Sequence, residues 1–289
     1  GRMESIYLST LSECEIYNNK PTFLKKVLSQ EVPKTKDIRK RSHLINRVTT
    51  GCFPEPVQRK GELRIQAWYQ QYVNALIQRD IKDISDIQHP ALMVSLLNII
   101  TYYSGKLINV SDIGNKVGLN KLTIKKYISL LEQLFLVKIL PAWHTNEYKR
   151  LVKTPKIHVT DTGLICAVRD ITSKRLMSDP SELGSLLETF VYNELCKQAV
   201  WVMAPINFYH YRDKDKVEVD IIIEDVIGNC IAIEVKTTAS LSDKDFVGLK
   251  KFKQIAKGKF KMGILLYDGD HSTSFGDNLY AVPIASLWS

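Results

Sequence analysis

The chain has 289 residues, of which 45% are hydrophobic and 25% are charged. This composition is typical of a globular protein, and the length suffices for about two domains. No apolar run approaches the roughly 20 residues of a transmembrane helix, and no signal peptide opens the chain. These features exclude a membrane-spanning protein and predict a cytoplasmic protein with no membrane partner.

Five cysteines are scattered along the chain without a Cys-x-x-Cys pair, and the histidines form no HExxH or His-x-His cluster. An odd number of isolated cysteines indicates free thiols in a reducing compartment, with neither a disulfide framework nor a zinc site. The cysteines are Cys14, Cys52, Cys166, Cys196 and Cys230.

The net charge of +9 is unevenly distributed. Residues 1–150 contain 23 Lys and Arg against 13 Asp and Glu, whereas residues 151–289 contain 17 against 18. A pI near 9.1 with a basic first half predicts an anionic partner, nucleic acid and DNA in particular. The basic segment KTKDIRKR (34–41) is by itself typical of a solvated loop or helix face.

The first 85 residues carry turn, proline and helix signals but no catalytic constellation. These signals lie in GRMESIYLSTLSECE (1–15), GCFPEP (51–56) and WYQQYVNALIQRDI (68–81).

Residues 90–140 predict three consecutive helices. Pro90 suits a first helical turn, and apolar residues keep helical spacing from there to Gly105. Ser111 is placed to cap a short second helix that ends near Val117. A turn, Gly118-Leu119-Asn120, then leads into a third helix with apolar residues at Leu122, Ile124, Tyr127, Ile128, Leu131 and Leu134.

Two helices joined by a glycine-containing turn are a helix-turn-helix signal, and FLVKIL (135–140) with KTPKIHVT (153–160) would supply the strands of a winged helix. Lys121, Lys125 and Lys126 would edge the third helix and could meet phosphates. The alternative stays open, because many winged helices bind proteins and such lysines commonly face water. No Arg, Gln or Asn lies mid-helix to contact base edges, so recognition of shape or phosphate is expected rather than sequence-specific readout.

The segment ELGSLLETFVYNELCKQ (182–198) has apolar residues at helical spacing and predicts another helix. Glu188 lies at the border of its apolar stripe, where a half-buried carboxylate requires a partner. Taken alone, Glu188 is more simply a border glutamate that reaches solvent.

EVDIIIEDVIGNCIAIEVKTT (218–238) contains two β-branched runs around a turn and predicts a hairpin. In the second strand, Glu234 and Lys236 share a face. Because side chains alternate along a strand, one face of the first strand should carry Val217, Val219, Ile221 and Ile223, and the other Glu218, Asp220, Ile222 and Glu224.

The hairpin register decides whether the charged side chains meet. A two-residue turn at 228–229 would set Asp220 opposite Thr237, where no site could form. A three-residue loop at 226–228, with its glycine in the left-handed conformation, instead sets Asp220 opposite Glu234. We favour the longer loop for the chemistry that it permits, not for its turn propensity.

Two facing carboxylates in such strands repel each other and need a cation, a shared proton or water. Asp220 and Glu234 offer the hard oxygen ligands that Mg²⁺ or Mn²⁺ prefers, and Lys236 adds a positive charge. A bound Mg²⁺ neutralises phosphoryl oxygens and generates hydroxide at neutral pH, so phosphodiester hydrolysis fits these residues. Alternatively, Glu-x-Lys is a solvated pair, or Asp220 and Lys236 form a purely structural ion pair.

Residues 244–270 predict a further helix and then the strand MGILLY (262–267) beside the hairpin. YAVPIASLW (280–288) predicts a last strand and a short helix.

Glu188 on a helix, followed by Asp220 and then Glu234-x-Lys236, resembles the core of the PD-(D/E)xK nuclease superfamily. The resemblance implies that Asp220, Glu234 and Glu188 hold a divalent metal ion and that Lys236 positions or activates the attacking water. Val219 stands where the superfamily name has proline. Because the superfamily also contains members that have lost cleavage, the resemblance implies either a Mg²⁺-dependent nuclease or a non-catalytic binding module.

The order of the short motifs resembles a family of bacterial and archaeal AAA-type ATPases with a C-terminal domain of unknown function. The matching pieces are GR (1–2), LSxxE (11–15), GxxPE (51–55), Tyr72 through Arg79-Asp80-Ile81, DTGL (161–164), LExFVYNEL (187–195), EVD (218–220) and EVK (234–236).

No P-loop, G-x-x-x-x-G-K-[ST], occurs in the sequence, since Gly105-Lys106 and Gly258-Lys259 lack both the leading glycine and the hydroxyl residue that follows. The chain starts where the family's ATPase core would be ending. We therefore expect no ATP hydrolysis by this chain. ATP would bind only to an ATPase core of the same family, joined to this chain in cis or associated with it in trans.

The combined prediction is a multi-domain α/β protein, with an ATPase lid or linker over 1–85, a winged helix over 86–160 and a nuclease-like α/β domain with a mixed sheet over 161–289. Its predicted function is that of a DNA-associated module of an AAA-type ATPase, possessing a nuclease-like metal site. The alternative is a non-catalytic module that binds nucleic acid or protein.

Overall fold

The computed structural model describes residues 8–35, 40–84, 90–202 and 204–288. The predicted α/β class is confirmed for these residues. Gly1-Arg2, residues 36–39 of the basic segment 34–41 and the predicted domain boundary at residue 85 lie outside the described residues. No helix within the described residues combines the length and hydrophobicity that a membrane span requires.

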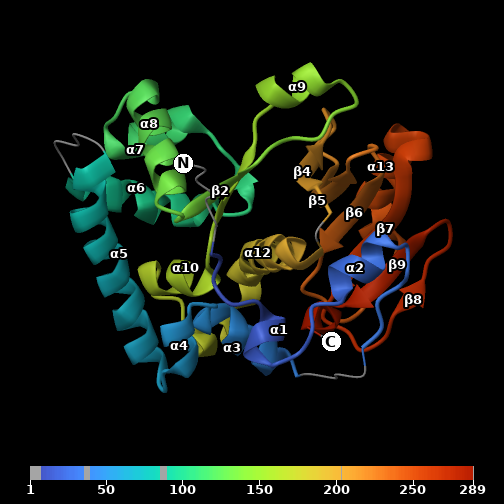
Figure 1. The fold of residues 1–289 in the computed structure, drawn as a ribbon, viewed down its shortest axis with the longest axis horizontal. Helices are drawn as coiled ribbons and strands as arrows, with labels where there is room; N and C mark the ends of the chain where they lie inside the picture. The colour runs from blue at the N-terminus through green and yellow to red at the C-terminus, as the bar shows by residue number, and fades with distance from the viewer. Residues whose placement is uncertain (1–7, 36–39, 85–89, 203, 289) are drawn as a thin grey trace, which may run out of the picture.

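Figure 1 shows the helices and strands in chain order. The α-helices are α1 (Glu13–Ile16), α2 (Phe23–Leu28), α3 (Arg41–Thr50), α4 (Pro54–Gln58), α5 (Glu62–Ile84), α6 (Pro90–Tyr103), α7 (Val110–Val117), α8 (Lys121–Gln133), α9 (Glu147–Val152), α10 (Thr162–Val168), α11 (Ser173–Ser178), α12 (Leu183–Val202) and α13 (Val247–Ala256). Short 3-10 helices are η1 (Pro180–Glu182), η2 (Asp243–Phe246), η3 (Lys257–Lys259) and η4 (Ile284–Trp288). The strands are β1 (Lys106–Leu107), β2 (Val137–Leu140), β3 (Lys156–Val159), β4 (Ile206–Arg212), β5 (Glu218–Asp225), β6 (Cys230–Val235), β7 (Phe260–Tyr267), β8 (Thr273–Ser274) and β9 (Leu279–Pro283).

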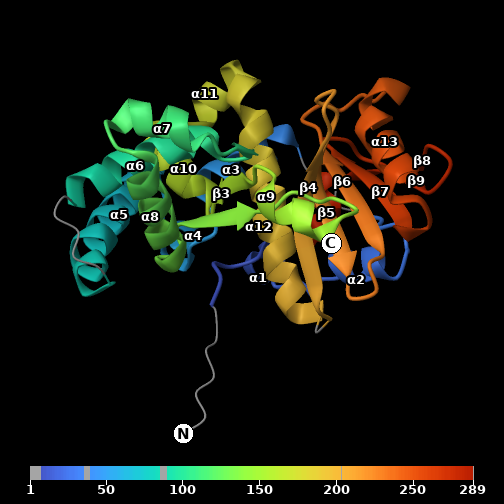
Figure 2. The same ribbon diagram turned by 90° about the horizontal axis from the view of Figure 1, so that it is seen from above.

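The described strands form two sheets. A three-stranded antiparallel sheet has the order β1-β3-β2, and a six-stranded sheet has the order β4-β5-β6-β7-β9-β8. In the larger sheet β6, β7 and β9 run parallel while the other neighbours are antiparallel, as the predicted mixed sheet requires. Figures 1 and 2 show α5 to α8 at one end of the molecule, the larger sheet at the other, and α12 between them.

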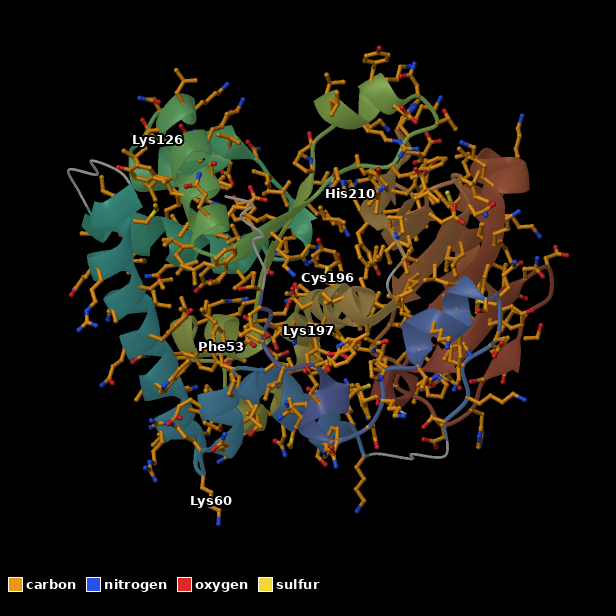
Figure 3. The ribbon with its side chains drawn as sticks, viewed as in Figure 1. Phe53, Lys60, Lys126, Cys196, Lys197 and His210 are labelled. Carbon is orange, nitrogen blue, oxygen red and sulfur yellow. The ribbon has the colours of Figure 1, made fainter. Side chains whose placement is uncertain are left out.

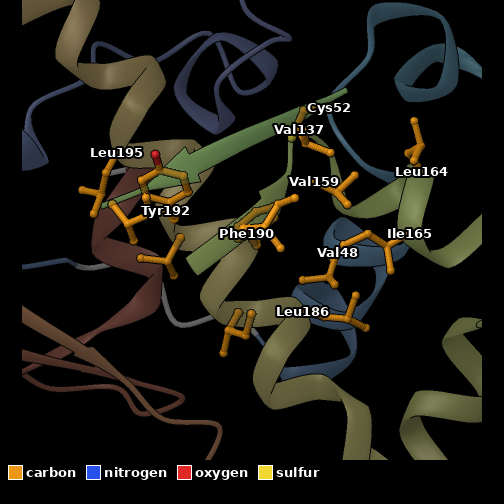
Figure 4. Packing of buried hydrophobic residues seen from close by; sticks show 14 of the residues in the cluster. Val48, Cys52, Val137, Val159, Leu164, Ile165, Leu186, Phe190, Tyr192 and Leu195 are labelled. Atoms are coloured by element: carbon orange, nitrogen blue, oxygen red, sulfur yellow. The ribbon is translucent and has the colours of Figure 1, made fainter. Parts of the chain in front are cut away.

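Helix α12 runs through the middle of one continuous hydrophobic core that extends from α1 to η4. Figure 4 shows Leu186 and Phe190 of this helix near Val159 of β3 and Val48 of α3. A second cluster, with Phe252 of α13, covers the opposite face of the larger sheet. All three predicted segments contribute to the larger core, and their boundaries stay predictions.

The predicted helices between residues 90 and 134 are present as α6, α7 and α8. The predicted cap of α7 is wrong: Asn109 is the cap, and its Oδ1 accepts a hydrogen bond from Asp112 N at 3.0 Å. Asparagine is as good a cap as serine. Because β1 already ends at residue 107, the helix begins at Val110, and Ser111 lies inside it. Gly118 ends α7 at φ +70°, and Asn120 caps α8, as the predicted turn requires.

The insertion between β2 and β3, which contains α9, was not predicted and joins the two sheets (Figure 2). His210 N of β4 donates to Pro141 O at 2.9 Å, and His210 O accepts from Trp143 N at 2.6 Å. Farther along, Arg150 pairs with Glu224 at 2.7 Å. The insertion therefore fixes β3 relative to β4 and β5.

The DTGL motif begins α10. Asp161 Oδ1 accepts hydrogen bonds from Gly163 N at 2.9 Å and Leu164 N at 3.3 Å, which satisfies donors at the start of the helix. A Cβ atom on Gly163 would lie 2.5 Å from the carbonyl oxygen of Thr50. Only glycine therefore allows α10 to approach the end of α3 this closely.

Candidate functional site

Glu188 projects from α12 toward the junction of the two sheets. Its side chain is 13% exposed. Gly105, in the turn between α6 and β1, has φ +78°, and a Cβ atom there would lie 3.4 Å from the carboxyl group of Glu188. The turn thus packs closely over this carboxyl group.

The hairpin has the register that the three-residue loop predicts. Ile221 lies opposite Ile233 in that register, and Asp220 comes next to this pair, close enough for its charge to act on Glu234. Gly228 has φ +82°, the left-handed conformation expected of it. Asp220 Oδ2 also accepts a hydrogen bond from the backbone of β6, from Val235 N at 2.9 Å.

One expected face of β5 is wrong. Ile221 and Ile223 pack in the larger core as predicted, but Val219 packs in the second cluster, with Phe252. The cause is an irregularity in the pairing of β4 and β5, where Tyr209 lies opposite Ile222 but Tyr211 lies opposite Val219. The extra β5 residue reverses the alternation of side chains beside Asp220.

Two lysines compensate the carboxylates. Lys236 Nζ lies 3.0 Å from Glu234 Oε1. Lys156 of β3, which is 2% exposed, lies 2.8 Å from Glu188 Oε1 and 3.5 Å from Asp220 Oδ1. We call these five residues, Glu188, Asp220, Glu234, Lys156 and Lys236, the carboxylate cluster.

Lys156 is the cluster member that the sequence did not identify. It lies in KTPKIHVT, which was predicted only as a strand of a winged helix. The signal that could have identified it is polar alternation: Lys156 and His158 alternate with Ile157 and Val159, and all four are buried. His158 Nδ1 lies 3.2 Å from Thr189 Oγ1, so both polar side chains of this strand point toward α12.

The cluster favours bound protons. Burial, and then the charge of Asp220, raises the pKa of Glu188 well above its usual value. The same two causes raise the pKa of Glu234 from 4.5 to about 8. Burial opposes ionisation of Lys156, but Glu188 and Asp220 outweigh it, so its pKa is raised and it stays an ammonium ion.

These shifts predict that stability falls as pH rises. Between about pH 4.5 and pH 8 the unfolded chain ionises Glu234 while the folded chain keeps it protonated, so the folded state binds more protons. Up to about 1.4 kcal/mol per pH unit is then lost over this range. Urea unfolding at several pH values should give a shallower dependence for Glu234→Gln, whereas the exposed control Glu147→Gln should follow the wild type. The same pH dependence of the free energy of unfolding in all three proteins would contradict the raised pKa of Glu234.

The cluster presents carboxylate oxygens but not an open metal site. Within the described residues, no three or more His, Cys, Asp or Glu side chains converge in a way that could hold a metal ion. Glu234 Oε2 is buried and has no hydrogen-bond partner. The ammonium group of Lys156, however, stands between Glu188 and Asp220. These two residues and Glu234 cannot share one ion while Lys156 remains there, and the predicted metal site stays a prediction.

The three lysines predicted to contact nucleic acid lie apart from the cluster. Lys121, Lys125 and Lys126 are all exposed on α8. Figure 3 places Lys126 at the outer end of the helical part of the molecule. Leu122, one of the apolar residues named for this helix, is 79% exposed and lies outside the core.

Two family models match the chain, and both are described as domains of unknown function. DUF8612 matches residues 41–175, and DUF4143 matches residues 183–287. The second match includes α12 and the hairpin, and therefore every member of the carboxylate cluster except Lys156.

Two curated proteins are similar to the chain, uncharacterized proteins of Mycobacterium bovis and Mycobacterium tuberculosis. Each is 24% identical over 233 residues, which is 81% of this chain and 51% of the relative. The chain therefore spans about half the length of the curated relatives that it matches.

One solved structure was also found, a half-complex of McrB AAA+ hexamers with bound McrC from Thermococcus gammatolerans. The similarity covers 67% of this chain and 48% of that chain at 11% identity. Its TM-score of 0.27 is too low to establish a shared fold.

Proposed function

We propose that the chain is a nucleic-acid-binding module of an AAA-type ATPase, with a nuclease-like site that Lys156 holds closed. The ATPase core would act in cis or in trans, because this chain has no P-loop. Support comes from the order of the motifs and from the DUF4143 match over residues 183–287.

The position of Lys156 carries the proposal. Its ammonium group lies within 3.5 Å of both Glu188 and Asp220 and is almost fully buried. Two buried carboxylates therefore have a cation supplied by the protein itself, and their electrostatics do not require a metal ion. Because Lys156 belongs to the smaller sheet, opening the site requires this side chain or the smaller sheet to move.

The element order supports interpretation of the smaller sheet and its helices as a winged helix. The chain runs α6, β1, α7, α8, β2, then the insertion with α9, then β3, and β3 pairs with both other strands. The second helix of the pair, α8, exposes Lys121, Lys125 and Lys126, a pattern that suits contacts to phosphate. The basic excess of residues 1–150 agrees with an anionic partner.

The proposal predicts binding of DNA without cleavage. Fluorescence anisotropy with a labelled DNA strand at low salt should give saturable binding that weakens as salt rises. The same strand should remain intact after incubation with Mg²⁺ or Mn²⁺. Absence of binding even at low salt would overturn the proposed function.

A second candidate function is phosphodiester hydrolysis with Mg²⁺ or Mn²⁺. Glu234 Oε2 is buried without a hydrogen-bond partner and Glu234 feels the charge of Asp220, which favours this candidate. Asp220 and Glu234 would hold the ion, with Glu188 joining once released, and the ion would supply charge neutralisation and an acidified water. Lys236, 35% exposed, would steady the nucleophile from the solvent side. Metal-dependent cleavage that Asp220→Asn abolishes would establish this candidate instead; equal cleavage by the variant would indicate contamination.

A further inference from the structure

A pocket lies where the two sheets meet, beside the carboxylate cluster. Its volume is about 320 Å³. The walls come from the end of α6, from β1 and β3 of the smaller sheet, and from β4 and β5 of the larger sheet. We call this the junction pocket, and its lining residues are Tyr103, Gly105, Lys106, Leu107, Lys156, Arg212 and Glu218.

Positive charge predominates among the lining residues. Lys106, Lys156 and Arg212 come from three different strands, and Glu218 is the one acidic residue among those described in the wall. Glu218 Oε2 accepts a hydrogen bond from Arg212 Nη1 at 2.9 Å. Lys153 Nζ reaches the backbone oxygen of Arg212 at 3.5 Å, which places a fourth cation beside the pocket.

The cations retain donors for a ligand. An ammonium group has three N–H donors, and Lys156 directs two toward Glu188 and Asp220. A guanidinium group has five, and Glu218 accepts from one nitrogen of Arg212. Lys106 is exposed on β1. An anion with several acceptor oxygens could therefore bridge the two sheets.

Two carboxyl groups of the carboxylate cluster, those of Glu188 and Asp220, lie next to Lys156 and could repel an anion in the pocket. Their repulsion is weakened for the following reasons. Glu188 has a raised pKa and is covered by Gly105, and Asp220 is bound by the backbone of β6 as well as by Lys156. Phosphate oxygens pair well with both arginine and lysine. The pocket also lies between the end of α6 with β1 and the first strand of the hairpin, β5.

We propose that the junction pocket binds one phosphate group of a nucleic-acid backbone, through Lys106, Lys156 and Arg212. This inference rests on the proposed function and adds the point at which the strand meets the nuclease-like site. Contact from Lys156 would link the strand to the carboxylates that the same lysine neutralises.

The test uses the labelled DNA strand with single variants of the intact chain. Lys106→Gln and Arg212→Gln should each raise Kd about tenfold, as expected for loss of a hydrogen bond to a charged group, and should lower the salt slope by about one. Glu218→Gln should instead tighten binding, because it removes the acidic residue of the wall. Lys60→Gln is the matched control and should change Kd less than twofold; Lys60 is exposed, does not line the pocket and lies at the lower end of the molecule in Figure 3.

The outcomes separate this inference from the proposed function. Binding by the wild type with no change in Lys106→Gln, Arg212→Gln and Glu218→Gln would overturn the pocket but leave the proposed function intact. Absence of wild-type binding would overturn the proposed function as well. Inorganic phosphate should compete with the strand; phosphate that stabilises the wild type but not Arg212→Gln, with strand binding unchanged, would show a free-phosphate site and overturn the backbone assignment.

Discussion

Replacing Lys156 with methionine will lower the free energy of unfolding by about 3–5 kcal/mol at pH 8. The variant keeps the length and packing of the side chain but leaves Glu188 and Asp220 without the ammonium group that lies between them. At pH 5 the loss will be smaller, because Glu188, whose pKa is raised by burial, neutralises itself by taking a proton. Urea unfolding at the two pH values measures both effects.

Mn²⁺ should restore part of the lost stability in Lys156→Met, by about 2.7 kcal/mol at a hundredfold excess over Kd. It should have no such effect on the wild type, where Lys156 occupies the position between the carboxylates. Lys60→Met is the control for loss of an exposed lysine and should unfold like the wild type. A Lys156→Met protein as stable as the wild type at pH 8 would mean that the lysine does not neutralise the cluster.

The second large effect is expected for Arg47→Met, which should also cost about 3–5 kcal/mol. Arg47 of α3 donates three hydrogen bonds to the carboxylate of Glu13, at distances from 2.9 to 3.2 Å. Glu13 is fully buried, so the variant leaves a charged group in the core without its partner. Urea unfolding at neutral pH measures the loss.

The double variant Glu13→Leu/Arg47→Met should recover much of that loss, because well-packed apolar residues can replace a buried ion pair. Arg59→Met is the matched control. Arg59 pairs with Glu55 at 2.8 Å one turn earlier on the surface, and such pairs contribute between about 0 and 1 kcal/mol. A double variant no more stable than Arg47→Met would indicate that the pair is needed for packing rather than for charge compensation.

Several motifs that carry the family resemblance meet in one buried polar network. Glu13 N of the LSECE segment donates to Glu194 Oε2 of the YNEL segment at 3.0 Å. Cys52 N of the GCFPE segment donates to Asp161 Oδ2 of the DTGL motif at 2.7 Å, and Tyr69 donates to Asp161 Oδ1 at 2.7 Å. These four motifs therefore join segments that are far apart in the sequence within the buried part of the molecule.

Helices and strands were predictable from the sequence where the spacing of apolar residues matches the face that packs in the core. Apolar spacing predicted α12, and β-branched runs predicted β5 and β6. The hairpin register followed from a chemical argument about Asp220 and Glu234, because the loop sequence also permits a shorter turn with another register. The tail strand MGILLY is present within β7, which pairs with β6 as predicted.

The features that the sequence did not reveal depend on contacts between distant segments. Lys156 reaches Glu188 because β3 packs against α12, through contacts such as that of His158 with Thr189. The irregular pairing that moves Val219 to the other face involves β4, which no local pattern in the hairpin specifies. Lys156 and Glu188 are separated by 31 intervening residues, and no alternation within one strand could indicate that pair.

Calorimetric titration with Mn²⁺, on the wild type, Lys156→Met and Lys156→Met/Asp220→Asn, tests the closed site most directly. We expect no binding by the wild type at millimolar metal, binding by Lys156→Met, and loss of that binding when Asp220→Asn is added. Binding by the wild type that disappears in Asp220→Asn would contradict it, and would mean that Asp220 and Glu234 form a metal site with Lys156 in place.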